Sequence, residues 1–293
     1  MSGSSDASQA APDGFAPFPF HGPFAAQVGP FYQCPRGDGR FLYGFRAEAR
    51  HRNAQDHIHG GALYSFADHL AGHAVVHATG RFCATLKLKV EFIAAAPVGA
   101  WIEGECTIQR VTRTLAFVRV LLRSGTRAVL SADGCFRLFG DLTPRTRAGI
   151  APQASAPAPA PDGYRPFRLQ GEFPALYGPM LYRQDADGRY VCGLATGSGH
   201  DNGFSVVHGG VQFAFVDDLM GRAVAATSRR YASTIALDVS YLASVPVGGW
   251  LEGHADIAGL DEDHCYIRAS VSHAGEAVLT ADGIWRLFKR FDN

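Results

Sequence analysis

Residues 53–68 read NAQDHIHGGALYSFAD, and residues 202–217 read NGFSVVHGGVQFAFVD. Both stretches place an Asn, a His-Gly-Gly triplet and an Asp at the same spacing, and the step from His59 to His208 is 149 residues. One constant shift that relates many motifs indicates a duplicated domain. Other motifs repeated at this shift are Gly29-Pro30 and Gly178-Pro179, Thr85 and Thr234, Pro97-Val98-Gly99 and Pro246-Val247-Gly248, and Arg137-Leu138-Phe139 and Arg286-Leu287-Phe288.

Each repeat contains the same order of expected elements. In the first, residues 40–47 form the first expected strand, and a loop leads from it to the His-Gly-Gly triplet. Apolar side chains then recur at steps of three and four from Gly60 to Ala78, which predicts a long helix. Four segments rich in β-branched and aromatic residues, separated by Gly-containing turns, predict antiparallel strands at residues 85–93, 101–111, 115–123 and 128–139.

This order predicts the fold class. One helix cannot cover both faces of such a sheet, so we expect the sheet to curl around its helix and the two halves to pair edge to edge. The chain is therefore expected to be an α+β protein of two tandem domains. Each would be a curled antiparallel sheet wrapped around one long helix, and the two would form an intramolecular pseudo-dimer.

Composition sets the expected domain boundaries. The 293 residues are 47% hydrophobic, which is enough for two cores. Residues 1–23 and 141–167 are rich in Ala, Pro and Ser, and we expect a disordered tail and an interdomain linker there. The two domains are then expected at residues 24–140 and 168–293.

Charge and hydropathy limit the expected partners. The 27 Lys and Arg balance 27 Asp and Glu, so no net charge would attract nucleic acid or an anionic membrane. Apolar runs of about 18 residues and a signal-peptide pattern are both missing, which predicts a cytoplasmic protein. The six cysteines contain no C-x-x-C pair and are expected to be reduced thiols.

The repeated motif Asn-x5-His-Gly-Gly-x6-Asp of residues 53–68 and 202–217 resembles the signature of the hotdog-fold acyl-CoA thioesterases of the PaaI-like type. The resemblance covers nearly all of both repeats. It implies a tandem, or double, hotdog protein that hydrolyses a small or medium acyl-CoA to the free acid and CoA. It implies no cofactor.

Thioester hydrolysis needs an activated water and donors directed at the developing oxyanion. The resemblance assigns the general base or nucleophile to the Asp, the orientation of water and carbonyl to the Asn and His, and support of the Asp to a Thr. Glycines at a helix start expose N–H groups that stabilise negative charge. The catalytic candidates are Asp68, Asp217, Asn53, Asn202, His59, His208, Thr85, Thr234, Gly60 and Gly209. The substrate-binding candidates are Gly61, Gly210 and a basic cluster for CoA containing Arg81, Lys87, Arg229 and Arg230.

The spacing of the motif predicts how the halves cooperate. Gly60 and Asp68 are eight residues apart, which on one helix is about 12 Å along the axis. A single helix therefore cannot place both at one reacting carbon. Two antiparallel helices can, if the Asp of each lies beside the start of the other. We thus expect Asp68 to work with Gly209, and Asp217 with Gly60.

Other interpretations remain open. The histidines at 57, 59, 69, 73 and 77 could suggest a metal site, but only His59 is repeated in the second half, so no metal is expected. A non-catalytic acyl-CoA-binding module and a hotdog enoyl-CoA hydratase are the alternative functions, and homo-oligomers of the chain are compatible with the sequence. Asp217 is followed by Asp218 but Asp68 by His69, so the two sites need not be equally active.

Overall fold

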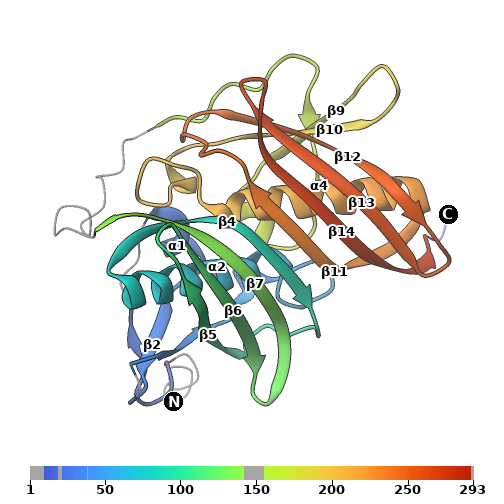
Figure 1. Cartoon of the computed structure of the whole chain (residues 1–293). Coiled ribbons are helices and arrows are strands. Elements are labelled where there is room, and N and C mark those ends of the chain that lie inside the picture. Colours follow the sequence, from blue (N-terminus) through green and yellow to red (C-terminus); the bar gives the residue numbers. More distant parts are fainter. Residues whose placement is uncertain (1–9, 19–21, 38, 142–154, 292–293) are drawn as a thin grey trace, which may run out of the picture.

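A single 14-stranded sheet curls around two long helices in the computed structural model, which describes residues 10–18, 22–37, 39–141 and 155–291 (Figure 1). The strand order is β1-β2-β3-β5-β6-β7-β4-β11-β14-β13-β12-β10-β9-β8, which reads as two copies of one domain joined at β4 and β11. The strands of the first half are β1 (Ala16–Pro17), β2 (Phe31–Pro35), β3 (Phe41–Arg46), β4 (Arg81–Phe92), β5 (Trp101–Val111), β6 (Leu115–Ser124) and β7 (Arg127–Asp141). Those of the second are β8 (Arg165–Pro166), β9 (Met180–Gln184), β10 (Tyr190–Ala195), β11 (Arg230–Tyr241), β12 (Trp250–Leu260), β13 (His264–His273) and β14 (Glu276–Arg290).

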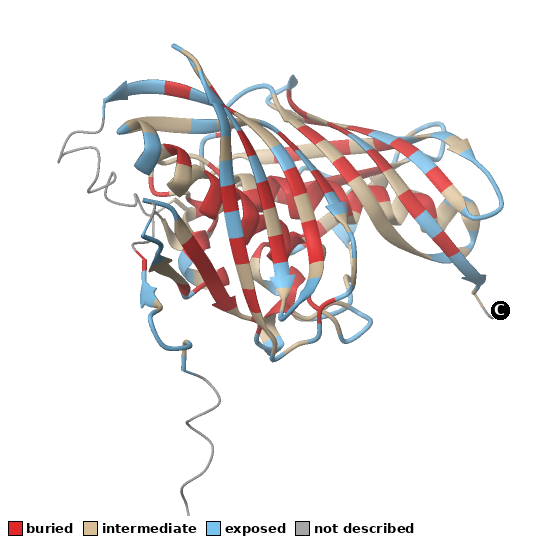
Figure 2. Ribbon diagram, turned by 60° about the horizontal axis from the view of Figure 1, so that its bottom comes forward, coloured by how far each residue is buried: buried red, intermediate tan, exposed pale blue. Residues whose placement is uncertain are grey.

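The two long helices are α2 (Gly60–Thr79) and α4 (Gly209–Ser228), which begin where the sequence predicts. Each starts after a His whose ring caps the first turn, and each ends at a residue in the left-handed conformation: Gly80, with φ of 65°, and Arg229, with φ of 58°. Buried residues occur on every side of both helices because a sheet covers one face and the other helix covers the opposite face (Figure 2). The predicted α+β tandem architecture is confirmed.

The halves meet along a pseudo-two-fold axis. β4 and β11 pair antiparallel, with Lys89 opposite Asp238, and these two residues occupy equivalent positions in the repeats. Above this seam α2 packs on α4, and the equivalent residues Tyr64 and Phe213 stack with ring centroids 3.7 Å apart. A continuous sheet and a shared helix interface therefore place the start of each helix beside the middle of the other.

The N-terminal segment of each half packs against the other half. Phe24, in the short helix α1 (Pro23–Val28), donates its N–H to Asp201 O at 3.2 Å. Phe173, in the 3₁₀ helix η2 (Phe173–Leu176), donates to Arg52 O at the same distance. Each loop that precedes a long helix is thus supported by the opposite half.

Parts of the expected tail and linker belong to the fold. In the expected tail, β1 pairs with β2, and Phe18, only 1% exposed, packs on Phe31 and Tyr43. In the expected linker, β8 pairs with β9, and Tyr164 Oη donates to Glu252. These apolar and aromatic residues complete the sheet edges. Residues 1–9 and 142–154 of the expected tail and linker lie outside the described residues.

The described residues contain no helix long and apolar enough to cross a membrane. They also contain no group of three or more potential metal-ligating side chains. His73 instead interacts with Tyr43 Oη at 2.9 Å, and His77 lies edge-on to Phe41. All six cysteines are free thiols.

Candidate active site

The start of each long helix carries one backbone N–H group that the helix itself does not use. His59 Nδ1 accepts a hydrogen bond from the Gly61 N–H at 2.9 Å, and the His59 carbonyl oxygen accepts those of Ala62 and Leu63. His208 and Gly210 form the same cap in the second half, also at 2.9 Å. The N–H groups of Gly60 and Gly209 therefore point out of the helix ends, where the helix dipole favours negative charge.

The two candidate carboxylates are held in the same way in both halves. Thr85 Oγ1 donates to Asp68 Oδ1 at 2.6 Å, and Thr234 Oγ1 donates to Asp217 Oδ1 at 2.8 Å. Each Asp is only 8% exposed. Burial raises the pKa of Asp68 to about 6 although the hydrogen bond from Thr85 opposes the shift. Burial and the neighbouring charge of Asp218 raise the pKa of Asp217 to about 6 as well.

Each carboxylate lies against the helix start of the opposite half. A Cβ atom on Gly60 would be 3.4 Å from Asp217 Oδ2, and one on Gly209 would be 3.0 Å from Asp68 Oδ2. Only a glycine leaves this space between the carboxylate and the helix end. The structure thus places Asp68 beside Gly209 and Asp217 beside Gly60, the proximity that the helix spacing predicts. We call the two places the Asp68 site (Asp68, Thr85, His208, Gly209) and the Asp217 site (Asp217, Thr234, His59, Gly60).

The two asparagines shape the loops before the helices. Asn53 Oδ1 accepts the N–H groups of Gln55 at 2.8 Å and His57 at 3.1 Å. Asn202 Oδ1 accepts that of Phe204 at 2.9 Å. Each side-chain oxygen is thus used in an Asx-type turn. The side-chain NH₂ group is the part of each Asn that is left to orient water or a carbonyl.

The Asp217 site contains a polar network that the sequence did not reveal. His59 Nε2 lies 3.6 Å from Asp218 Oδ1, and Tyr177 Oη donates to Asp218 Oδ2. Burial is the largest influence and lowers the pKa of His59, but the charge and hydrogen bond of Asp218 and the charge of Asp217 together outweigh it, and the pKa is raised above its usual value. A second proton on the ring would break the hydrogen bond from Gly61. In the neutral ring the proton therefore lies on Nε2, facing Asp218.

In the Asp68 site the equivalents of Asp218 and Tyr177 are His69 and Val28. Phe24 packs against His208 there, with ring centroids 5.3 Å apart, and burial lowers the pKa of His208 to about 4. His208 is therefore neutral at physiological pH. Comparison of the repeats reveals the exchange of Asp218 for His69, but not that Asp218 would meet Tyr177 and His59.

The Asp68 site has its own pair of polar groups in Tyr64 and Tyr241. Their hydroxyl oxygens are 2.7 Å apart, and Tyr241 Oη also donates to Gly209 O at 2.9 Å. The equivalent residues in the Asp217 site are Phe213 and Phe92. The two sites thus share a carboxylate, a threonine and a helix start, and differ in the groups around them.

Comparison with known proteins identifies the family. A family model described as the thioesterase superfamily matches residues 55–131 and 204–280, which together make up just over half of the chain. The chain belongs to the thioesterase superfamily. Its two matched segments are the two repeats recognised in the sequence.

A named relative agrees with the duplication. A Pseudomonas aeruginosa protein named as an esterase, PA0474, is 30% identical over 129 residues, which are 43% of this chain and 96% of that protein. It therefore corresponds to one repeat.

Solved structures match the double domain. A structure of a thioesterase II from Thermobifida fusca superposes with a TM-score of 0.66 at 14% identity, over 94% of this chain and 100% of that one. The acyl-CoA thioesterase II TesB2 of Mycobacterium marinum superposes with a TM-score of 0.62 at 11% identity, over 90% and 98% of the two chains. At these identities the similarity shows the fold, and the matching fold is the TesB-like double hotdog.

The residues of the predicted basic cluster make contacts within the protein. Arg81 Nε and Nη1 donate to the carbonyl oxygens of Phe139 and Arg113, at 2.7 and 2.8 Å, and Arg230 bonds the equivalent carbonyls in the second half. Lys87 forms an ion pair with Asp238 at 2.8 Å. Arg229 serves as the left-handed C-cap of α4. Arg81 and Arg230 therefore tie strand ends together, and Lys87 ties β4 to β11.

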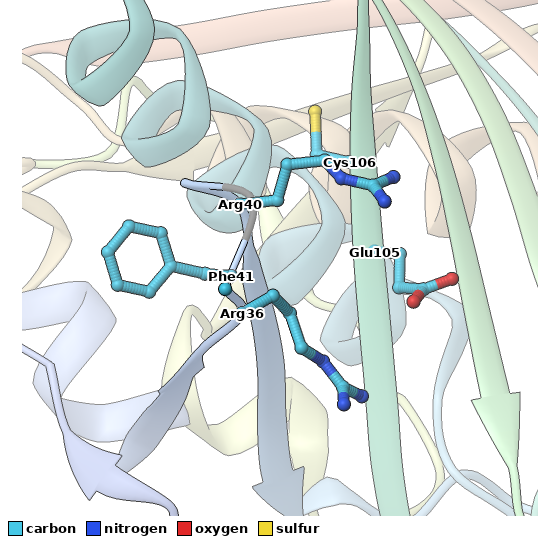
Figure 3. A pocket seen from close by; sticks show the side chains of 6 residues that line it. Arg36, Arg40, Phe41, Glu105 and Cys106 are labelled. Carbon is cyan, nitrogen blue, oxygen red and sulfur yellow. The ribbon is translucent and has the colours of Figure 1, made fainter.

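A cavity of about 410 Å³ lies in the first half, away from both sites (Figure 3). Its lining includes Arg36 and Arg40 from the β2–β3 hairpin and Glu105 and Cys106 from β5. None of these residues belongs to the repeated Asn-x5-His-Gly-Gly-x6-Asp motif.

Proposed function

We propose that this protein is an acyl-CoA thioesterase with two composite sites, each formed by the Asp of one half and the helix start of the other. The observation that carries this proposal is the contact of a buried carboxylate with the outward-pointing N–H end of a helix, found twice. Membership in the thioesterase superfamily supports hydrolysis as the reaction. The repeated Asn, His-Gly-Gly and Asp motif supports the same catalytic groups as in PaaI-like thioesterases, here in a TesB-like double hotdog fold.

The proposed reaction in the Asp217 site begins with the thioester carbonyl oxygen bound by the Gly60 N–H. The Asp217 carboxylate takes a proton from a water molecule, whose oxygen attacks the carbonyl carbon. Negative charge moves to the carbonyl oxygen, where the helix end stabilises it. The intermediate collapses with cleavage of the C–S bond, and Asp217 returns its proton to the departing thiolate. The products are a free acid and CoA.

The hydrogen bond from Thr234 directs the chemistry to one carboxylate oxygen. It occupies Asp217 Oδ1 and leaves Oδ2 facing Gly60. The raised pKa of about 6 makes Asp217 a stronger base than an exposed Asp while it remains ionised at neutral pH. The Asp68 site offers the same arrangement through Thr85 and Gly209.

The test is release of free thiol from a panel of short- and medium-chain acyl-CoA esters by the purified protein. We expect hydrolysis by the wild type, a partial loss in Asp68→Asn or Asp217→Asn, and a loss of about 10²-fold or more in the double variant, as for removal of a general base. Asp187→Asn, in an exposed loop, is the matched control. A double variant that retains full activity would overturn the proposal, and consumption of enoyl-CoA without thiol release would indicate a hydratase instead.

A further inference from the structure

The Asp68 site contains two tyrosine hydroxyls close to the helix start at Gly209. Tyr241 Oη would be 3.4 Å from a Cβ on Gly209, on the helix start that Asp68 Oδ2 also faces. Tyr64 Oη is 2.7 Å from Tyr241 Oη. Tyr64 is fully buried and Tyr241 is half-buried. The two hydroxyls and the carboxylate therefore surround the same small space.

The hydrogen bonds fix which way these hydroxyls point. Tyr241 Oη–H donates to Gly209 O, so the hydrogen bond between the two tyrosines must be donated by Tyr64. Both hydroxyl protons are then engaged in hydrogen bonds. Among the described residues, neither oxygen accepts any other hydrogen bond, and each retains acceptor capacity. The pair therefore offers only acceptors to a molecule in the site, and Asp68 adds a further acceptor.

The Asp217 site provides an internal comparison. Its equivalents of Tyr64 and Tyr241 are Phe213 and Phe92, and a Cβ on Gly60 would be 3.0 Å from Phe92 Cζ. The rings thus occupy matching places in the two sites, and only the hydroxyls differ. Both hydroxyls already have hydrogen-bond partners, and what distinguishes the Asp68 site is that their oxygens can still accept a further hydrogen bond, which the phenylalanines of the other site cannot.

We propose that Tyr64 and Tyr241 form an acyl-binding subsite in the Asp68 site that accepts a hydrogen bond from a hydroxyl group on the acyl chain. This inference rests on the proposed thioesterase function and adds the substrate class. The Asp68 site takes acyl groups with a hydroxyl within a few bonds of the thioester carbonyl, because Tyr241 and Asp68 face the same glycine. The Asp217 site, with phenylalanines in these places, takes apolar acyl groups.

The experiment compares 3-hydroxybutyryl-CoA with butyryl-CoA in variants that isolate each site. Asp217→Asn leaves the Asp68 site, and Asp68→Asn leaves the Asp217 site. We expect the ratio of kcat/KM values, hydroxyacyl over acyl, to be about 3- to 10-fold higher in Asp217→Asn, as one neutral hydrogen bond provides. Adding Tyr241→Phe to Asp217→Asn should lower the ratio to that of the Asp217 site.

The fold accommodates a Tyr-to-Phe substitution at these positions, because Phe92 and Phe213 are the equivalents of Tyr241 and Tyr64 in the other half. The converse variant adds Phe92→Tyr and Phe213→Tyr to Asp68→Asn, and we expect it to raise the ratio. Equal ratios in the two single-site proteins, or a ratio that Tyr241→Phe leaves unchanged, would overturn the inference while the hydrolysis itself stands.

A binding measurement separates failure of the inference from failure of the proposed function. S-butyl-CoA and S-(3-hydroxybutyl)-CoA are thioethers, which the protein cannot hydrolyse. Calorimetry on Asp217→Asn should show about 3- to 10-fold tighter binding of the hydroxylated thioether. Tyr241→Phe should abolish this difference. If no ester is cleaved but the difference is present, hydrolysis is wrong and the subsite is correct. If binding shows no difference, the subsite is wrong.

Discussion

Asp68→Asn should make the protein more stable at pH 8 while it inactivates one site. Asp68 is 8% exposed, and burial raises its pKa to about 6 from an ordinary value of 3.8. Each pKa unit corresponds to about 1.4 kcal/mol, so ionisation of this side chain costs the folded protein about 3 kcal/mol above pH 6. Because folding raises this pKa, the contribution of Asp68 to the free energy of unfolding is most favourable below about pH 4 and falls as the pH rises through 6.

An Asn at this position removes the ionisation and keeps an oxygen for the hydrogen bond from Thr85. Its NH₂ group would face the N–H of Gly209, donor against donor, which offsets part of the roughly 3 kcal/mol released by removing the ionisation. We therefore expect a net gain of about 1–3 kcal/mol at pH 8. For a protein of this size, that gain raises the Tm by roughly 2 to 10 °C.

The assay is thermal unfolding of wild type, Asp68→Asn and the exposed-loop control Asp187→Asn at pH 8 and at pH 4.5. The gain in Asp68→Asn should be largest at pH 8 and small at pH 4.5, and the control should follow the wild type at both. If Asp68→Asn is no more stable than wild type at pH 8, or gains equally at both pH values, then ionisation of buried Asp68 does not destabilise the folded protein.

Three further outcomes are expected from the same geometry. Thiol release by the wild type should rise with pH around a midpoint near 6, where Asp68 and Asp217 ionise; a flat profile from pH 5 to 8 would exclude them as bases. In the Asp68→Asn background, Thr234→Val should move the midpoint of the remaining site to higher pH, because the threonine hydrogen bond lowers the pKa of Asp217; Thr234→Ser should leave it in place. Asp68→Asn combined with His208→Ala should retain the activity of the other site, whereas Asp68→Asn combined with His59→Ala should nearly abolish turnover. The reverse order of these two double variants would place each site within one half.

The difference between the two sites shows where sequence reasoning stopped. The repeated Asp, Thr and His-Gly-Gly positions were found because they recur at one shift, and the structure brings Asp, Thr and Gly together as predicted. Tyr177 and Asp218 are not repeated in the first half, where Val28 and His69 occupy the equivalent positions. Their hydrogen bond joins residues 41 positions apart. Only the packing of η2 against the loop before α2 brings this pair to His59.

The internal partners of the predicted basic residues were not evident from the sequence either. Arg81 and Arg230 lie near strand ends, where charge alone suggested a rim for CoA. In the folded chain their guanidinium groups satisfy carbonyl oxygens at the ends of strands from the same half. Sequence records the charge of a side chain but not which unpaired backbone oxygens will come within its reach.

The sequence by itself determined what depends on neighbouring residues: the duplication, the helix starts after His59 and His208, and the apolar periodicity of helices and strands. It also excluded a site within one helix, since the axial rise between Gly60 and Asp68 is fixed by helix geometry. Tertiary structure alone decided the chemistry of each site. The exposure of Asp68 and Asp217, and therefore their pKa, depends on how α2 and α4 pack inside one shared sheet, because desolvation is a property of the surroundings and not of the residue.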